Sequence, residues 1–232
     1  MGRQRPGLAA GAVLVWLLVG YRRWVRPWMY RWGAGPDECV AALPGDDLVT
    51  PDAPRTTRAI TIGAPPEHVW PWLAQIGEDR GGFYSYDLLE RMVGADIHNA
   101  DVIHPEWQRL RTGDRVWLAR RYGERGSQLV AEVAPGAHLV LVSDDDYDRQ
   151  ARGLPAWGAW SFHLRPHRGG TRLLVRGSGG LVGHAGFDVA HFIMEQKMMR
   201  GIRRRAERLW RESSGEPRCG APESLPAATA TP

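Results

Sequence analysis

The chain has 232 residues, of which 43% are hydrophobic, and a net charge of +4, enough for one domain with a sizeable core plus appendages. Its basic excess lies at the two ends: residues 1–35 hold six arginines and no acid, and residues 186–212 hold seven basic and four acidic residues, whereas residues 36–185 are net acidic. This distribution argues against a nucleic-acid partner, which usually needs basic residues concentrated on the folded domain. The two cysteines lie in the flanks and form neither a disulfide framework nor a zinc motif.

The N-terminal segment begins with an uncharged apolar run from Leu8 to Tyr21, which is shorter than the ~20 residues that a spanning helix prefers. A cleaved signal peptide is the main alternative, but no clear small-x-small cleavage site follows the run. Arginines interleaved with tryptophans follow instead, as is typical of an interfacial collar: Arg22, Arg23, Arg26, Arg31, Trp24, Trp28 and Trp32. We therefore predict that residues 1–32 form a transmembrane or interfacial anchor, with the rest of the protein on the cytoplasmic side of the membrane.

Residues 33–54 are rich in Gly, Pro and Asp and are interpreted as a linker. The alternation in residues 55–63 predicts a strand, and a helix should follow and end at Gly77, with a kink at its interior Pro71. A second short helix is predicted from Ser85, a suitable N-cap, to Val93. Residues 94–112 show no clean period and are predicted to form a long ordered loop.

From residue 113 the chain is typical of β structure. One strand is predicted at residues 113–120, two more are joined by a turn at Pro135 and Gly136, and a second hairpin should turn at residues 168–170. A long helix is predicted at residues 186–211. Its second half has an apolar stripe, and its first half is apolar almost all round, so we expect that half to be covered on most sides. The tail, residues 213–232, is predicted to be disordered.

This order of elements predicts an α+β fold in which residues 55–212 form one domain. An antiparallel sheet with one apolar face needs a cover, and the C-terminal helix is the only element long enough to provide it. A curved sheet that grips this helix should leave a cavity between them, closed at one end by the two short helices.

Several runs resemble the SRPBCC superfamily, which includes START, birch-pollen-allergen and polyketide cyclase/dehydrase-like proteins. They are "RWGAGPDE", "LPGDDLV", "TRAITIGAPPEHVWPWLAQIGEDRGGFYSYDLLE", "IHNADVIHPEWQRLRTGD", "TRLLVRG" and "FIMEQKMMRGIRRRAE". They are most similar to a bacterial subgroup with an N-terminal hydrophobic segment. The resemblance implies a helix-grip fold with a cavity for a hydrophobic ligand, but no particular reaction.

The stretch from Gly81 to Gln108 holds the candidate chemistry. Its metal-ligand types match no metal motif in spacing, so no metal site and no cofactor are predicted. If the domain is an enzyme, its acid–base groups should be His98, Asp101 and His104, with His163 and His191 as further candidates on the sheet and the last helix.

Aromatic residues are the candidate ligand-binding groups, although ordinary core packing should account for many of them. They are Trp72, Phe83, Tyr84, Tyr86, Trp107, Trp160, Phe162 and Phe192. Arg172 and Arg176 share one strand face and are structural if paired with acids, or could bind a carboxylate if they point inward.

The leading hypothesis is a membrane-tethered domain that binds a hydrophobic small molecule or lipid. One alternative is a cavity enzyme of the polyketide cyclase/dehydrase type that uses acid–base residues of the 84–106 region. Another is a membrane-surface adaptor whose basic C-terminal helix meets a partner, and whose cavity is filled by side chains. A small apolar cavity would favour the adaptor.

Overall fold

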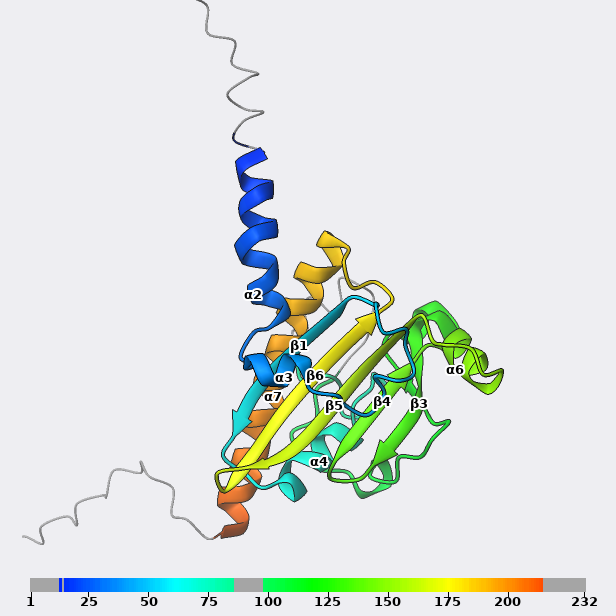
Figure 1. Ribbon diagram of the computed structural model, residues 1–232. Coiled ribbons are helices and arrows are strands. Elements are labelled where there is room, and N and C mark those ends of the chain that lie inside the picture. Colours follow the sequence, from blue (N-terminus) through cyan, green and yellow to red (C-terminus); the bar gives the residue numbers. More distant parts are fainter. Residues whose placement is uncertain (1–12, 14, 86–97, 215–232) are drawn as a thin grey trace, which may run out of the picture.

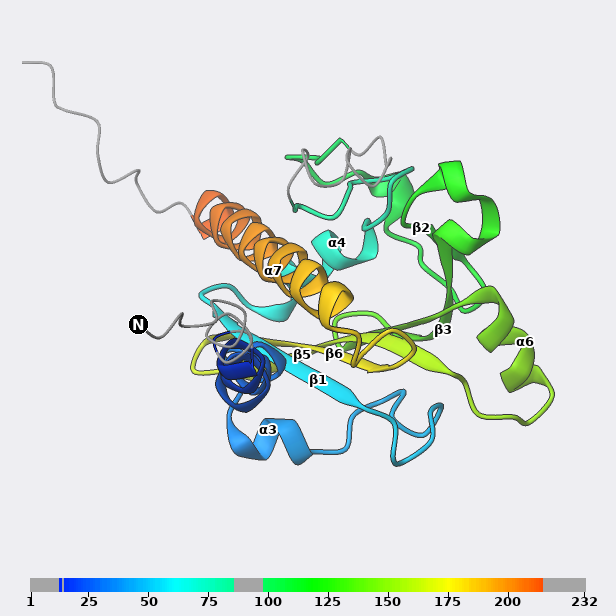
Figure 2. The ribbon, with the colours of Figure 1, turned by 90° about the horizontal axis from the view of Figure 1, so that it is seen from above.

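The computed structural model describes residues 13, 15–85 and 98–214. They form an α+β fold in which helix α7 (Ala185–Ser214) lies across one face of a six-stranded antiparallel sheet of order β1-β6-β5-β4-β3-β2 (Figures 1 and 2). This arrangement confirms the predicted fold class and fits a helix-grip architecture. The short helix expected at Ser85–Val93 falls almost wholly outside the described residues, as does the tail beyond residue 214.

The strands agree closely with those expected from the alternation of residues. They are β1 (Arg55–Ile62), β2 (Arg115–Trp117), β3 (Ser127–Ala134), β4 (His138–Val142), β5 (Gly158–His167) and β6 (Gly170–Gly179). Gly136 has a φ of 79°, which suits the third position of a type II turn after Pro135. Arg168 and Gly169, between β5 and β6, both have positive φ, as a tight type I′ hairpin turn requires.

The remaining helices are short. They are η1 (Tyr21–Val25), α2 (Arg26–Tyr30), α3 (Pro36–Val40), α4 (Pro66–Ala74), η2 (Pro105–Trp107), η3 (Arg120–Gly126) and α6 (Asp144–Ala151). Helix α4 includes Pro71. The sequence analysis did not anticipate α6, which begins at Ser143, whose hydroxyl accepts a hydrogen bond from the backbone N–H of Asp146.

The core lies between the inner face of the sheet and helices α4 and α7. Alternate residues of the strands point into it, among them Ile62, Phe162 and Leu173. From α7 the buried residues are Met198, Met199, Ile202 and Ala206, four of the five members of the predicted apolar stripe. Each large buried apolar side chain contributes roughly 1.5–3 kcal/mol, so this interface accounts for much of the stability of the domain.

Helix α7 approaches the loop after α4 very closely at Gly201. A β-carbon at this position would lie 2.5 Å from the carbonyl oxygen of Tyr84 and 2.7 Å from its β-carbon. Since Tyr84 is fully buried and its backbone has a φ of 56°, this loop cannot easily move away.

We therefore expect Gly201→Ala to lower the free energy of unfolding by about 1–3 kcal/mol, because the methyl group forces α7 away from the loop. Gly186→Ala is the matched control: it lies in the same helix, and a β-carbon there would meet nothing within 4 Å. The control should be neutral or slightly stabilising, since alanine favours helix. Urea unfolding of both variants tests this, and equal effects would refute the role given to Gly201.

Residues 33–54, which were expected to be a linker, pack on the outer face of the sheet, opposite α7 (Figure 2). Leu43 and Val49 are buried there. Arg172 forms two hydrogen bonds to the carboxylate of Glu38, at 2.7 and 2.8 Å. The segment is thus held to the sheet by both apolar burial and an ion pair.

Arg176 is the centre of this outer contact and is only 1% exposed. Its guanidinium donates to Thr57 on β1, to the carboxylate of Asp46 at 2.5 Å, and to the backbone carbonyls of residues 38, 39 and 41. Arg172 and Arg176 therefore share one strand face and are paired with acids, which confirms their structural interpretation and excludes an inward-pointing role.

Residues 15–30 are helical and lead into the domain through α2, which contacts the first half of α7 (Figure 1). The phenol of Tyr30 donates to Asp188 at 2.7 Å, and the ring of Trp28 packs edge-on against Phe192. The helix before α2 projects away from the domain and exposes large apolar side chains such as Trp16. Within residues 13, 15–85 and 98–214, no helix is both long and apolar enough to cross a bilayer.

The first half of α7 is less covered than expected. Only Asp188, Phe192 and Glu195 are buried in it, and these follow a single stripe. Val189 and Ile193 are 38% and 41% exposed, so the prediction that this half is covered on most sides was wrong. The start of α7 lies at the same end of the molecule as the projecting N-terminal helix (Figure 1).

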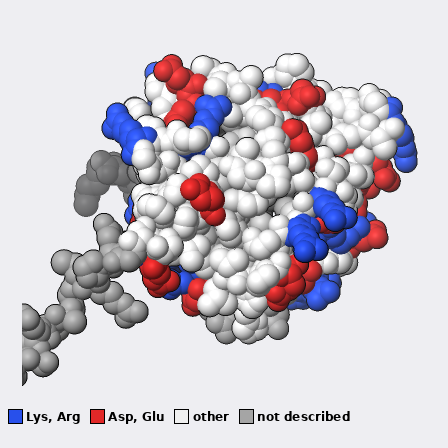
Figure 3. Space-filling view, turned by 90° about the horizontal axis from the view of Figure 1, so that it is seen from below, with Lys and Arg blue, Asp and Glu red and all other residues white. Residues whose placement is uncertain are grey.

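The opposite end has a different surface. Seen from below, it carries acidic and basic side chains scattered mainly around its edge, and much of its centre is uncharged (Figure 3). Recognition of a charged molecule on this face therefore depends on local clusters rather than on a broad surface of one sign.

Candidate functional site

A buried ion pair lies between the sheet and α7. Arg58 of β1 points to the same side of the sheet as Ile60 and Ile62, and its Nη1 lies 2.5 Å from Oε2 of Glu195 on α7. Both side chains are 1% exposed. Glu195 also accepts a hydrogen bond of 2.8 Å from the indole Nε1 of Trp160 on β5. Two elements of the sheet and the gripped helix thus meet at one carboxylate.

Glu195 remains ionised in this position. Burial alone would raise its pKa, but the charge of Arg58, the neighbouring His191 and the hydrogen bonds from Arg58 and Trp160 more than offset this, so the pKa of Glu195 is lowered. The cluster is therefore a fixed charge pair, surrounded mainly by aromatic rings.

His191 completes the cluster. Its Nδ1 lies 3.4 Å from Nη1 of Arg58, and its Nε2 lies 3.7 Å from Oε1 of Glu195. Burial, opposed by Glu195 and reinforced by Arg58, lowers the pKa of His191, so the ring is neutral near pH 7. Because a guanidinium can only donate, Nδ1 must be the acceptor and Nε2 must carry the proton.

The cluster reaches the surface along one edge. The side chain of His191 is 24% exposed, its ring stacks on that of Phe187 at 5.1 Å, and Trp160 is also only partly buried. This edge belongs to the first half of α7. A molecule could therefore approach the buried pair from the end of the protein that carries the N-terminal helix.

Four of the predicted ligand-binding aromatics lie at or next to the ion pair. The ring of Trp160 stacks on Phe83 at 6.2 Å and lies 4.7 Å from the ring of Phe162. The guanidinium of Arg58 sits 5.3 Å above the ring of Phe192. The structure thus places Trp160 and Phe192 against the ion pair, with Phe83 and Phe162 packed on Trp160.

The other predicted aromatics lie elsewhere. Trp72 and Tyr84 are buried deeper, and the phenol of Tyr84 donates to the backbone carbonyl of Trp72 at 3.0 Å. The indole N–H of Trp72 is buried and has no acceptor among the described residues. Trp107 is half-buried in η2, beside the ring of His104. Tyr86 lies outside the described residues.

The predicted acid–base candidates do not gather at the ion pair. His98 and Asp101 are exposed at the surface, and Asp101 pairs with Arg205 of α7 at 2.8 Å. His104 is half-exposed and lies 3.3 Å from Glu106. His163 is buried on the outer face of the sheet, where burial, the nearby His138 and two arginines lower its pKa to about 3. Of the five, only His191 belongs to the cluster.

Arg58 and Glu195 were missed from the sequence, although each leaves a signal. Arg58 is a charged residue on the apolar face of an alternating strand, which is unusual unless the charge is paired. Glu195 follows His191 by four residues, so both lie on the same side of α7. In the part of the chain that the structure describes, no three His, Cys, Asp or Glu side chains are grouped so that they could hold a metal.

In comparisons with known proteins, this chain is similar to solved structures alone, and at low sequence identity. No protein-family model matches it, and no curated protein matches it significantly. A protein from Mycobacterium smegmatis is 15% identical, with 71% of this chain and 96% of that chain covered and a TM-score of 0.41. An AHSA1-like protein from Aeromonas hydrophila is 14% identical over 73% and 100% of the two chains, with a TM-score of 0.37. An Aha1 protein from Colwellia psychrerythraea, solved as a dimer, is 16% identical over 62% and 93%, with a TM-score of 0.36.

Proposed function

We propose that the protein binds a mainly apolar small molecule or lipid at the aromatic cluster around Trp160, with the Arg58–Glu195 pair recognising its polar group. The observation that carries the proposal is the buried ion pair itself. Two charges in a protein interior cost several kcal/mol of desolvation each, and apolar residues of similar size would often be more stabilising. A pair kept between sheet and helix, next to the partly exposed His191, is therefore a candidate recognition site.

One further feature supports a ligand here. The rings of Phe83, Trp160 and Phe187 offer stacking surfaces close to a carboxylate and a guanidinium. Such a mixture suits a ligand with an apolar body and one polar end.

We also propose that the N-terminal helix holds the domain at a membrane surface on its cytoplasmic side. The helix exposes Trp16, Leu17 and Trp24 together with Arg22 and Arg23, the combination expected at a lipid headgroup layer. Since the open edge of the aromatic cluster lies at the same end of the molecule, an apolar ligand could enter it from the lipid.

Native mass spectrometry of the full chain purified in a mild detergent, followed by lipid extraction, tests the binding proposal. We expect a co-purifying apolar molecule, and saturable binding of added oleate. Trp160→Ala should weaken oleate binding by at least tenfold, because it removes a stacking ring and a donor to Glu195.

Trp157→Ala is the matched control, since it deletes the same side chain three residues away, where it is 67% exposed. Circular dichroism checks that both variants fold. The proposal fails if the wild-type chain neither carries an apolar molecule nor binds oleate, or if Trp157→Ala weakens binding as much as Trp160→Ala.

A second candidate function, acid–base catalysis on the bound molecule, is favoured by the neutral imidazole of His191 at the exposed edge of the cluster. Its one lone pair, on Nδ1, faces Arg58, so the ring could act as a base only after that contact opens. Incubating the extracted molecule with wild-type protein and with His191→Asn distinguishes the two: identical recovery of the unchanged molecule in both would rule out catalysis.

A further inference from the structure

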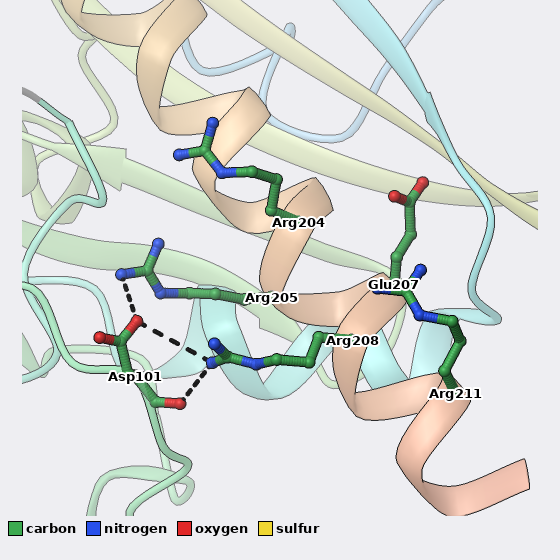
Figure 4. A pocket seen from close by; sticks show the side chains of 6 residues that line it. All are labelled: Asp101, Arg204, Arg205, Glu207, Arg208 and Arg211. Carbon is green, nitrogen blue, oxygen red and sulfur yellow. Dashed lines mark hydrogen bonds and ion pairs between the residues drawn. The ribbon is translucent and has the colours of Figure 1, made fainter. Parts of the chain in front are cut away.

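A surface hollow of about 440 Å³ lies at the C-terminal end of α7, away from the aromatic cluster. It is lined by Asp101, Arg204, Arg205, Glu207, Arg208 and Arg211 (Figure 4). Arg204, Arg205 and Arg208 extend to the same side of the helix, toward Asp101, whereas Glu207 points away from it (Figure 4). We refer to this site as the arginine hollow.

The charges of the arginine hollow do not balance. Four guanidinium groups face two carboxylates, which leaves a net charge of +2. Both carboxylates are already engaged: Asp101 with Arg205 at 2.8 Å, and Glu207 with the backbone N–H of Gly63 at 2.9 Å. Arg204 and Arg211 make no hydrogen bond or ion pair with the residues that the structure describes. The net charge of +2 is equal and opposite to the charge of about −2 that one phosphate group carries near pH 7.

The spacing of the arginines on α7 makes their charges repel one another. Arg204 and Arg208 are four residues apart on α7, and Arg208 and Arg211 are three apart. Like charges at these spacings are neighbours on a helix surface and destabilise it. An anion bound between them would remove this repulsion, whereas solvent alone only screens it.

Two of the donors are already positioned. The guanidinium of Arg205 donates to the carbonyl of Ala100 at 2.8 Å and lies 4.7 Å above the ring of Tyr84. Arg208 donates to the carbonyl of Asp101 at 2.7 Å. Because a guanidinium has five N–H donors in a fixed plane, these bonds hold the group while leaving other donors available.

The position of the hollow decides between a soluble and a membrane-bound anion. The N-terminal helix contacts α7 at Asp188, and from there to Arg208 the helix advances by 20 residues, or about 30 Å. The C-terminal end of α7, which lines the hollow, lies at the opposite end of the molecule from the N-terminal helix (Figure 1). The headgroup layer on each side of a bilayer is only about 5–8 Å thick, so a headgroup in a bilayer that contacts the N-terminal helix could not reach the hollow.

We propose that the arginine hollow binds the phosphate group of a soluble small molecule, as a second site separate from the aromatic cluster. Isothermal titration calorimetry of the full chain in an uncharged detergent, with inorganic pyrophosphate as the probe, tests this. We expect saturable 1:1 binding that weakens as the salt concentration rises. Arg204→Gln/Arg208→Gln should weaken it by at least about tenfold, since two charge-assisted contacts are lost.

The matched control is Arg125→Gln/Arg152→Gln, which removes the same charge from two exposed arginines outside the hollow. It should change the affinity by less than about twofold, because only distant charge is lost. The absence of saturable binding to the wild-type chain, or an equal loss in the control, overturns the proposal.

A vesicle assay separates the two sources of phosphate. Phosphatidylcholine vesicles with and without phosphatidic acid are compared for binding of the wild-type chain and the Arg204→Gln/Arg208→Gln variant. We expect the variant to bind both kinds of vesicle as the wild type does. Should it lose binding to the phosphatidic acid vesicles, the phosphate belongs to a lipid and the proposal of a soluble ligand is refuted.

Discussion

Replacing Glu195 with leucine should lower the free energy of unfolding by about 3–5 kcal/mol, because it leaves the charge of Arg58 buried without its partner. The 2.5 Å contact and the 1% exposure of both side chains make this the most enclosed ion pair among those of the described residues. Chemical unfolding followed by circular dichroism measures the loss. A surface ion pair would contribute no more than about 1 kcal/mol, so a loss of that size would show that water reaches the pair.

The double variant Arg58→Met/Glu195→Leu is the necessary control. When both charges are removed, no unpaired charge remains in the interior. The double variant should therefore regain most of the stability that Glu195→Leu loses. The same variant should bind the polar end of a ligand poorly while remaining folded. It therefore separates the contribution of the pair to recognition from its contribution to stability, and a double variant as unstable as Glu195→Leu would contradict this account.

A chain that begins at residue 55 should not fold, although the sequence places the start of the domain there. Without the preceding segment, Arg176 loses Asp46 and three carbonyl acceptors, and the buried Leu174 on the same face of β6 becomes exposed to water. The segment also supplies three buried apolar side chains, those of Met29, Leu43 and Val49. Burial of each stabilises the fold by roughly 1.5–3 kcal/mol. The sum is comparable to the whole stability of a typical domain, about 5–15 kcal/mol.

Residues 26–214 provide the comparison, since they keep α2, α3 and every contact named above. We expect a cooperative unfolding transition for this longer chain, and none for residues 55–214, when both are followed by tryptophan fluorescence in urea. A cooperative transition of similar midpoint for both would show that the outer segment is dispensable.

The sheet and the long helix could be predicted because their signals are local. Alternation of apolar and polar residues defined the strands, and an apolar stripe defined α7. Helix α6 had a local signal as well, since Ser143 is followed by three consecutive acids in the first turn, Asp144, Asp145 and Asp146. It was missed because a short, very polar helix has no apolar stripe to reveal it.

The candidate site could not be predicted from local patterns. Arg58 and Glu195 are 137 residues apart in the chain and meet only because β1 lies beneath the first half of α7. Histidines and acids in the stretch from 81 to 108 attracted attention because they are close in sequence, yet Asp101 is held at the surface by Arg205. Residues 33–54 are a similar case. Their content of Gly, Pro and Asp indicates a linker, whereas the arginines that bind this segment lie far away in the chain, on β6.

The contacts of α2 determine how the protein would stand on a bilayer. Trp28 and Tyr30 fix this helix to Phe192 and Asp188 of α7, and Arg58 donates to the carbonyl of Met29. The projecting helix is therefore fixed at its base to both α7 and β1. If its exposed face lies in a membrane, these contacts determine the tilt and the rotation of the domain relative to the bilayer.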